Sequence, residues 1–298
     1  MVNKKISFVI PAYNSQETIG LTLDSIFDGN FSNGDEIIVV NDSSTDKTLE
    51  IIESKSKNNK VNIRVITNST NRGCPASRNV GILQAKNELI MSLDSDNLLT
   101  KGIIEKLKNS LITQNADVTS VAEVHFFPEN PKYITHKWIF KKGFLNLSDL
   151  FCGNINPGPV GNYMFTKKSW EKVGGFEELH KGLHEAWIFT LKQLSSGSKF
   201  YITPNTEYLH KYGHESLTIR EYKDNVEKDI LSYAIDKLMP FLNDQIKLNL
   251  KSNNPRWIHE LNHNKIIIND DKVGVNGKLK RTLYGNYKSL LKIWKKKI

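Results

Sequence analysis

Cysteine is nearly absent from this 298-residue chain, which has only Cys74 and Cys152. Two cysteines so far apart form neither a metal-binding pattern nor a disulfide framework, so we expect a protein of a reducing compartment. Long apolar runs are missing too, and no stretch approaches the roughly 20 apolar residues that a membrane-spanning helix needs. The first residues carry no signal-peptide core, which favours a cytoplasmic location.

Acidic residues are missing from residues 278–298, which carry eight lysines and arginines. Since the whole chain has a formal net charge of +9, the rest is close to neutral, and we expect no nucleic-acid partner. Apolar residues, Trp294 among them, recur in this segment near helical spacing. A basic amphipathic helix of this kind binds anionic membrane surfaces, which predicts peripheral contact with the inner face of the cell membrane. Packing against the body, or against a second subunit of a homo-oligomer, explains the pattern equally well.

Two glycine-rich nucleotide-binding patterns are also missing. No G-x-G-x-x-G follows the first strand-like run, and no G-x-x-x-x-G-K-[ST] occurs anywhere. The dinucleotide-binding and P-loop versions of an α/β fold are therefore disfavoured. The composition, with 39% hydrophobic and 24% charged residues, is that of an ordinary globular protein with one large core or two modest ones.

Apolar strand-like runs alternate with helical patterns in the first part of the chain. The predicted strands lie at residues 6–13, 36–42, 61–67 and in the run from residue 88, and the predicted helices follow at 47–57, 72–85 and 102–114, with one more after the first strand. Asn14 or Ser15, with Glu17, predicts the N-cap of that first helix. The alternation predicts an α/β fold with a Rossmann-like, mixed but mostly parallel sheet flanked by helices. In such sheets ligands bind at the carboxyl ends of the strands.

The stretch from Glu88 to Asn97 begins as an apolar run and ends in two carboxylates, Asp94 and Asp96. On an extended chain these two side chains would point to the same side, with Ser95 turned away. Neighbouring carboxylates repel each other unless a cation lies near them, and their hard oxygens suit Mg²⁺ or Mn²⁺. The pattern predicts a metal–diphosphate site at the end of a buried strand. A solvated acidic turn is the alternative, because Asp-Ser-Asp-Asn also favours turns.

Several polar segments occur in order and at sensible spacing. They read Pro-Ala-Tyr-Asn at 11–14, Val-Asn-Asp-Ser-Ser-Thr-Asp at 40–46, Asn-Arg-Gly and Ala-Ser-Arg-Asn-Val-Gly within 71–81, Leu-Asp-Ser-Asp-Asn at 93–97, and Gly-Gly-Phe-Glu-Glu at 174–178. Together they resemble the inverting family 2 glycosyltransferases of GT-A fold. The resemblance implies a catalytic domain over residues 1–218. Long helical patterns from Arg220 onward predict a helical C-terminal extension over residues 219–298.

The resemblance also implies the reaction partners. The donor would be a nucleotide-sugar, most often a UDP-sugar, and the cofactor would be Mn²⁺ or Mg²⁺. The acceptor would be a hydroxyl of a glycan, of a lipid-linked sugar, or of a wall or capsule polysaccharide.

The resemblance further assigns roles to individual residues. The donor-binding positions of the family correspond here to Pro11, Ala12, Tyr13, Asn14, Asp42, Asn71, Gly73, Arg78, Asp94, Ser95 and Asp96. Tyr13 and Asp42 would contact the nucleoside, while Gly73 and Arg78 would line the diphosphate. Asp96 would be the firmer metal ligand, with Asp94 facing the ribose and sugar. His210 and His214 are further candidates to meet the metal or the diphosphate, and surface positions are the alternative for each.

One position departs from the family pattern. The family usually has Glu-Asp at the start of a late helix, where the aspartate is the general base, but this chain has Glu185-Ala186. Glu185 could take the role of base through its longer side chain, and a first-turn carboxylate favoured by the helix dipole is the alternative. Trp187 in the same helix is a predicted acceptor contact. A catalytically inactive nucleotide-sugar-binding relative is the alternative to an enzyme.

Overall fold

The computed structural model describes residues 4–59, 61–147, 149, 161–178, 185–212 and 265–267. The strands are β1 Ile6–Ala12, β2 Glu36–Asn41, β3 Ile63–Thr67, β4 Leu89–Ser92, β5 Asn97–Leu99, β6 Val118–Phe127, β7 His136–Ile139, β8 Gly143–Leu145, β9 Met164–Thr166, β10 Phe200–Lys211 and β11 Lys265–Ile267. The helices are α1 Ile19–Phe27, α2 Thr48–Asn59, α3 Cys74–Gln84, α4 Ile103–Thr113, α6 Lys167–Lys172 and α7 Glu185–Ser195.

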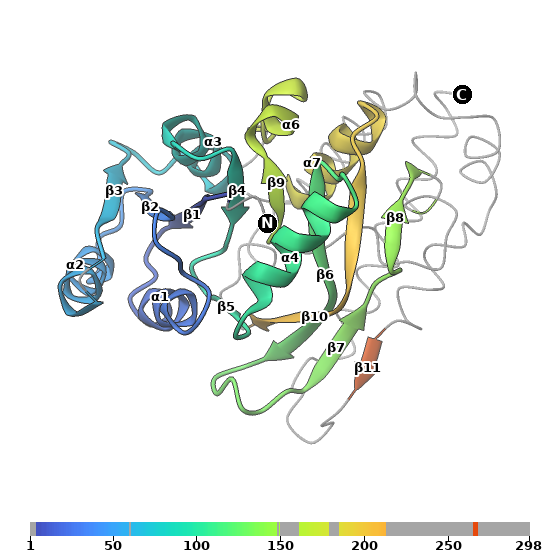
Figure 1. Ribbon diagram of the computed structural model, residues 1–298. Helices are drawn as coiled ribbons and strands as arrows, with labels where there is room; N and C mark the ends of the chain where they lie inside the picture. The colour runs from blue at the N-terminus through green and yellow to red at the C-terminus, as the bar shows by residue number, and fades with distance from the viewer. Residues whose placement is uncertain are drawn as a thin grey trace, which may run out of the picture.

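The strands of the described residues form one mixed sheet (Figure 1). Its order is β11-β7-β6-β9-β4-β1-β2-β3, and β10 pairs with β5, β6 and β8 beside this path. Strands β4, β1, β2 and β3 pair in parallel, as the alternation of strands and helices predicts. Strand β9 pairs antiparallel with both β4 and β6, and so joins the parallel part to the rest of the sheet. The predicted mixed α/β sheet is confirmed, with its parallel pairings concentrated in the N-terminal part.

The parallel strands end at a common edge. The N–H of Asp42 donates to the carbonyl of Ala12 at 2.8 Å, and the N–H of Asn68 donates to the carbonyl of Asn41 at 2.9 Å. On the other side of β1, the N–H of Leu93 donates to Val9. The loops that follow these strands therefore emerge side by side, which is where ligands of parallel sheets bind.

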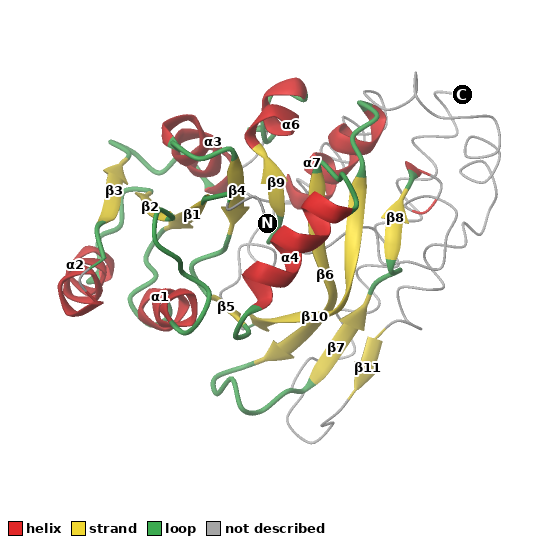
Figure 2. Cartoon of the chain, viewed as in Figure 1, coloured by secondary structure: helices red, strands yellow, loops and turns green. Residues whose placement is uncertain are grey.

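Helices cover both faces of the parallel strands (Figures 1 and 2). Helix α3 lies on one face, and α1 and α2 lie on the other. All residues of β1 and β4 are buried, so these strands read as continuous apolar runs rather than alternating ones. Helix α3 lies unusually close to the sheet at Gly81, where an added Cβ would be 2.5 Å from Cγ1 of Val9.

The predicted elements were largely right and their ends less so. The predicted N-cap of the first helix is wrong: α1 begins at Ile19 after Thr18, because Asn14 adopts a left-handed φ of 47° and its side chain accepts from the N–H of Thr45. The predicted helical extension over 219–298, including the basic segment 278–298, lies outside the described residues except for β11. No helix of the described part is long and apolar enough to cross a membrane.

Candidate active site

The predicted donor residues lie at the carboxyl ends of β1, β2 and β4, in the loop after β3 and on α3. Pro11 and Ala12 are buried in β1, whereas Tyr13 directly after it is 44% exposed. The side chain of Asn14 accepts from Thr45 at 2.9 Å and so ties the loop after β1 to the loop after β2. An exposed aromatic ring in a loop that is held in this way can pack against a flat ligand.

Asp42 is buried and accepts three hydrogen bonds. Its Oδ1 accepts from Nδ2 of Asn68 at 2.7 Å and from the N–H of Arg72 at 2.9 Å, and its Oδ2 accepts from the N–H of Gly73 at 2.7 Å. Gly73 has φ +89°, a conformation that costs glycine least, and it precedes the first residue of α3. Asp42 therefore fixes the loop through which the chain enters α3. The predicted residue Asn71 is half-buried in the same loop.

The Asp-Ser-Asp segment forms a turn rather than the continuation of a strand. Strand β4 ends at Ser92, and the N–H of Asn97 donates to the carbonyl of Asp94 at 3.3 Å. Ser95 turns to the loop after β1, where its hydroxyl lies 2.8 Å from that of Ser15. The alternative of an acidic turn is therefore right about the backbone, which does not continue as a strand after Ser92. Burial and the nearby charge of Asp94 nevertheless act together on the carboxyl group of Asp96.

Burial and the nearby charge of Asp94 raise the pKa of Asp96 to about 7. An excess of negative charge in a buried place is the physical cause, and a divalent cation would relieve it. His210 lies on β10 opposite Asn97 of β5. Its Nδ1 is buried with no hydrogen-bond partner among the described residues, and burial lowers the pKa of the ring to about 4. A neutral imidazole with an unused nitrogen is the form that binds metal ions.

These residues fit a divalent cation only with help from a ligand. Within the described part of the chain, no three histidine, cysteine, aspartate or glutamate side chains converge closely enough to hold an ion by themselves. A Mg²⁺ or Mn²⁺ ion held by one or two carboxylates and by substrate phosphates matches this arrangement. The other predicted metal contact, His214, lies outside the described residues.

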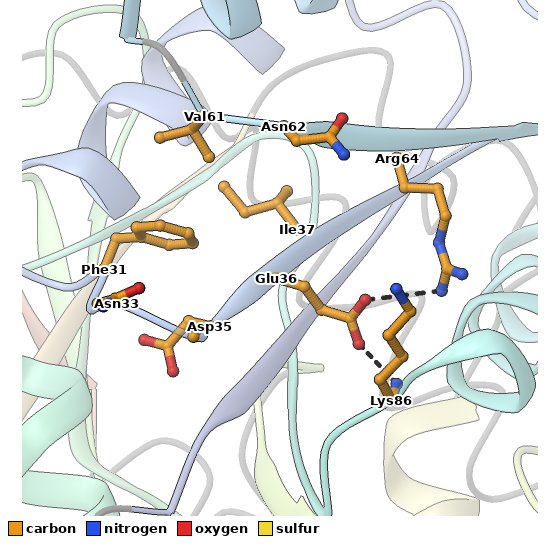
Figure 3. Close-up of a pocket in the computed structure, with 10 residues that line it drawn as sticks. Phe31, Asn33, Asp35, Glu36, Ile37, Val61, Asn62, Arg64 and Lys86 are labelled. Atoms are coloured by element: carbon orange, nitrogen blue, oxygen red, sulfur yellow. Dashed lines mark hydrogen bonds and ion pairs between the residues drawn. The ribbon is translucent and has the colours of Figure 1, made fainter.

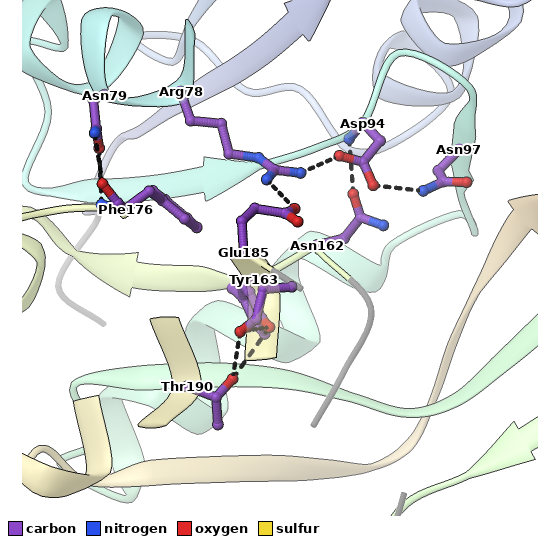
Figure 4. A network of polar contacts seen from close by, with 10 residues as sticks. Arg78, Asn79, Asp94, Asn97, Asn162, Tyr163, Phe176, Glu185 and Thr190 are labelled. Carbon is purple, nitrogen blue, oxygen red and sulfur yellow. Dashed lines mark hydrogen bonds and ion pairs between the residues drawn. The ribbon is translucent and has the colours of Figure 1, made fainter. Parts of the chain in front are cut away.

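Arg78 is the centre of a buried ion cluster that also contains Asp94 and Glu185 (Figure 4). Its side chain is 1% exposed, and its Nη2 donates to Oδ1 of Asp94 while its Nη1 donates to Oε1 of Glu185. The guanidinium carbon lies 5.3 Å from the centre of the Phe176 ring. The charged contacts of Arg78 in the structure are with these two carboxylates. Its predicted place beside the diphosphate stays a prediction.

Helix α7 brings the predicted base into this cluster. Glu185 is its first residue, and Trp187, the predicted acceptor contact, lies in the same turn and is partly buried. The hydroxyl of Tyr163 donates to the carbonyl of Ala186 at 2.7 Å, which anchors this turn to the strand region before β9. Position 186, where the family has an aspartate, carries only a methyl group.

Some residues of the site were missed by the sequence analysis. Oδ1 of Asn162 accepts from the N–H of Asp94 at 2.8 Å, and Nδ2 of Asn97 donates to Oδ2 of Asp94 at 3.0 Å. Asn79 accepts from Phe176 and Trp170 and donates to the carbonyl of Phe176. Asn79 and Asn97 stand within polar segments that carry the family resemblance, whereas no local pattern marks Asn162, because its role depends on a contact 68 residues away in the chain.

A separate hollow of about 320 Å³ lies at the opposite, amino ends of β2 and β3 (Figure 3). Its lining includes Phe31, Glu36, Arg64 and Lys86. Oε2 of Glu36 lies 3.7 Å from Nη2 of Arg64, so the charges of the rim are partly paired. None of the predicted site residues lines this hollow.

Comparison with known proteins identifies the family. A sequence model described as glycosyl transferase family 2 matches residues 7–174, more than half of the chain. The chain belongs to this family. Poly(ribitol-phosphate) beta-N-acetylglucosaminyltransferase TarS of Staphylococcus aureus (strain Mu50 / ATCC 700699) is 35% identical over 116 residues, which are 38% of this chain and 20% of TarS. The chain thus matches only a fifth of the length of this relative.

Solved structures show the fold of the family 2 chain. S. aureus TarS 1–349 in complex with UDP-GlcNAc has a TM-score of 0.65 at 21% identity, over 87% of this chain and 72% of that one. The mannosyltransferase PcManGT from Pyrobaculum calidifontis, in complex with GDP-Man and Mn²⁺, has a TM-score of 0.57 at 16% identity. The match covers 80% of this chain and 64% of that chain. The predicted family and GT-A fold are confirmed, and so is membership in a family of named glycosyltransferases.

Proposed function

We propose that this protein is a metal-dependent inverting glycosyltransferase that moves a sugar from a nucleotide-sugar, by preference a UDP-sugar, to a hydroxyl of a polymeric glycan. The observation that carries the proposal is the convergence of Asp94, Asp96, Arg78 and Glu185 at the carboxyl edge of a parallel sheet. This edge is where nucleotides bind in folds of this type. A UDP-sugar complex of a fold relative supports the choice of donor.

The donor would lie across the loops that follow β1, β2 and β4. The exposed ring of Tyr13 would pack against the base, beside the carboxylate of Asp42. Asp42 uses three hydrogen bonds for the loop before α3, and a carboxylate offers about four acceptor sites, so one acceptor site remains for an N–H of the base.

A divalent cation would be held by Asp96, with Asp94 and His210 as further contacts. When bound, such an ion stabilises the negative charge of the leaving diphosphate. The raised pKa of Asp96 and the unused Nδ1 of His210 support this assignment from the chain's own residues. Which metal acts is open to experiment, and Mn²⁺ is the first choice because a fold relative contains it.

Glu185 is our proposed general base. Arg78 holds its Oε1, whereas Oε2 makes no hydrogen bond to any described residue and is left to accept a proton from the acceptor hydroxyl. The hydroxyl oxygen would attack the anomeric carbon as the bond to the diphosphate breaks, and the configuration at that carbon would invert. Trp187, two residues on in the same helix, would contact the acceptor.

The proposed acceptor is a wall or capsule polymer or a lipid-linked glycan. The name of the relative TarS, which includes poly(ribitol-phosphate), supports a polymer of this kind. The basic segment 278–298 would bring the enzyme to an anionic membrane surface, which suits a lipid-linked acceptor.

Calorimetric titration tests the donor and metal sites. We expect wild-type protein to bind UDP and a UDP-sugar in the presence of Mn²⁺, and Asp96→Ala to lose the metal-dependent part of the affinity. The exposed Asp28→Ala serves as a control that removes one carboxylate far from the site and leaves binding unchanged. Equal binding by Asp96→Ala with and without Mn²⁺ would contradict the metal assignment.

Sugar transfer separates the enzyme from an inactive nucleotide-sugar-binding relative, since donor binding is expected of both. With a polymer acceptor and the best-binding donor, Glu185→Gln should lower kcat by about 100-fold or more, as expected when a general base is lost. Unchanged transfer by this variant would show that another group is the base. Donor binding without any transfer by the wild type would favour the inactive relative.

A further inference from the structure

The ion cluster connects residues to which the proposed function gives different roles. Asp94 belongs to the turn between β4 and β5, on the donor side, and Glu185 begins α7, on the acceptor side. Arg78 on α3 contacts both carboxylates with different nitrogens of one planar group (Figure 4). The two contacts cross 16 and 107 residues of sequence, so a single side chain ties together three separate segments.

We propose that Arg78 is a positioning residue, which sets the distance and angle between the donor-side carboxylate of Asp94 and the acceptor-side carboxylate of Glu185. It would act through these two groups and not as a ligand of the diphosphate. The inference rests on the proposed function, because it gives Asp94 and Glu185 the tasks described above.

The surroundings of the guanidinium leave little room for a phosphate. The side chain is almost fully buried, its two terminal nitrogens are each bonded to a carboxylate, and the ring of Phe176 covers it at 5.3 Å. Its Nε is buried and has no hydrogen-bond partner among the described residues. Both terminal nitrogens of Arg78 are thus directed to these carboxylates.

The contacts also restrain the Asp94 carboxylate more tightly than neutralising its charge would require. Oδ2 of Asp94 is held by Asn97 and its N–H by Asn162, so Arg78 completes the restraint on this residue. Behind the pair lies Gly161, where an added Cβ would be 2.8 Å from Oδ2 of Asp94 and 3.3 Å from Nη2 of Arg78. A rigid guanidinium fork can hold two carboxylates at a set angle, whereas the single ammonium of lysine cannot.

Stability alone is a weak reason to keep such a cluster. Buried ion pairs often contribute little net stability compared with apolar residues of the same shape, because removing the charges from water is costly. Misplacing reacting groups by about 1 Å, in contrast, can slow a reaction about 100-fold. The positioning role explains why a charged group occupies this place.

Arg78→Lys is the direct test, because it keeps the positive charge and removes the fork. We expect kcat to fall about 100-fold, while the Kd for UDP with Mn²⁺, measured by calorimetry, changes less than about threefold. Arg64→Lys makes the same exchange at the amino ends of the strands and should leave both values unchanged. A variant that loses thermal stability but keeps the wild-type kcat below its Tm would overturn the proposal, and so would a large loss of UDP affinity with unchanged kcat.

Gly161→Ala decides the matter if Arg78→Lys does not fold. It removes no charge, yet its methyl group would meet the Asp94–Arg78 pair and alanine at φ +72° would strain the backbone there as well, so kcat should fall by about 10-fold or more. A wild-type kcat in Gly161→Ala, with the variant shown to be folded by circular dichroism, would overturn the positioning role. A wild-type protein that binds a UDP-sugar but transfers nothing would contradict the proposed function, and the positioning role with it.

Discussion

At the scale of single residues, Asp42 shows how a predicted ligand contact can also carry structure. The resemblance to family 2 gave it a place beside the nucleoside, and nothing in the sequence indicates its three hydrogen bonds to Asn68, Arg72 and Gly73. These partners lie 26 to 31 residues further along the chain. A role read from a motif is therefore only part of what the residue does.

Asp42→Asn should destabilise the fold and weaken donor binding together. An amide has one acceptor oxygen in place of two, and its NH₂ group would face an N–H donor, so we expect a loss of about 1–3 kcal/mol in the free energy of unfolding. Urea unfolding measures the loss. Asp28→Asn, in an exposed ion pair with Lys101, should change the free energy by less than about 1 kcal/mol. Equal stabilities of the two variants would contradict the anchoring role of Asp42.

Which residues of the site lie near one another could be predicted in part from the sequence. Because the ends of parallel strands share an edge, the sequence brought Tyr13, Asp42 and Asp94 together correctly. It did not bring Glu185 to Arg78, because that contact crosses 107 residues and depends on how α7 packs behind β9. Patterns among neighbouring residues in the sequence do not indicate such packing.

At the scale of elements, α3 connects the sheet to both halves of the site. Its N-terminus is held by Asp42, Arg78 reaches the ion cluster, and Asn79 binds the turn at Phe176. Gly81 lets the helix lie close enough to β1 and β2 for these contacts to form.

Gly81→Ala should destabilise the protein although alanine favours helices. The new methyl group would lie 2.5 Å from Val9 and 3.1 Å from Val40, so the helix must move away from the sheet, at a cost of about 1–3 kcal/mol. Gly20→Ala is the matched change in α1, where the nearest atoms lie at 3.4 Å and belong to side chains of α2. Thermal unfolding should show a lower Tm for Gly81→Ala and an equal or higher one for Gly20→Ala. The reverse order would contradict the close packing of α3.

The sequence predicted the N-terminal strands of the sheet well and β10 poorly, although β10 itself pairs in parallel with β6. Strands β1, β2 and β4 are apolar runs between helices, and that pattern is local. Strand β10 was not predicted: its residues alternate irregularly in burial, and its pairing shifts register between Thr203 and Glu207. Because its partners β5, β6 and β8 all lie far away in sequence, only the folded chain shows that His210 lies opposite Asn97 of β5.

At the scale of the whole molecule, positive charge is concentrated in residues 278–298, which lie outside the described part of the chain. Removal of this segment should abolish binding to vesicles that contain anionic lipid, since each basic residue near such a surface contributes about 1 kcal/mol. Sedimentation of the full chain and of the shortened chain with anionic and with neutral vesicles measures the effect. Unchanged binding to anionic vesicles would dismiss the membrane role of this segment.

The position of β10 in the sheet has a consequence for how the protein is made. The N–H of Lys211 donates to Oδ1 of Asn97, a partner that leaves the ribosome 114 residues earlier. At ordinary rates of translation this interval lasts about 6 to 23 s. During that time the edge of β5 that β10 will cover stays open, and the edges of β6 and β8 stay open from their own synthesis until β10 follows; unpaired strand edges promote aggregation. The part of the sheet around β10 should therefore depend on chaperones during synthesis until Phe200–Lys211 have been made.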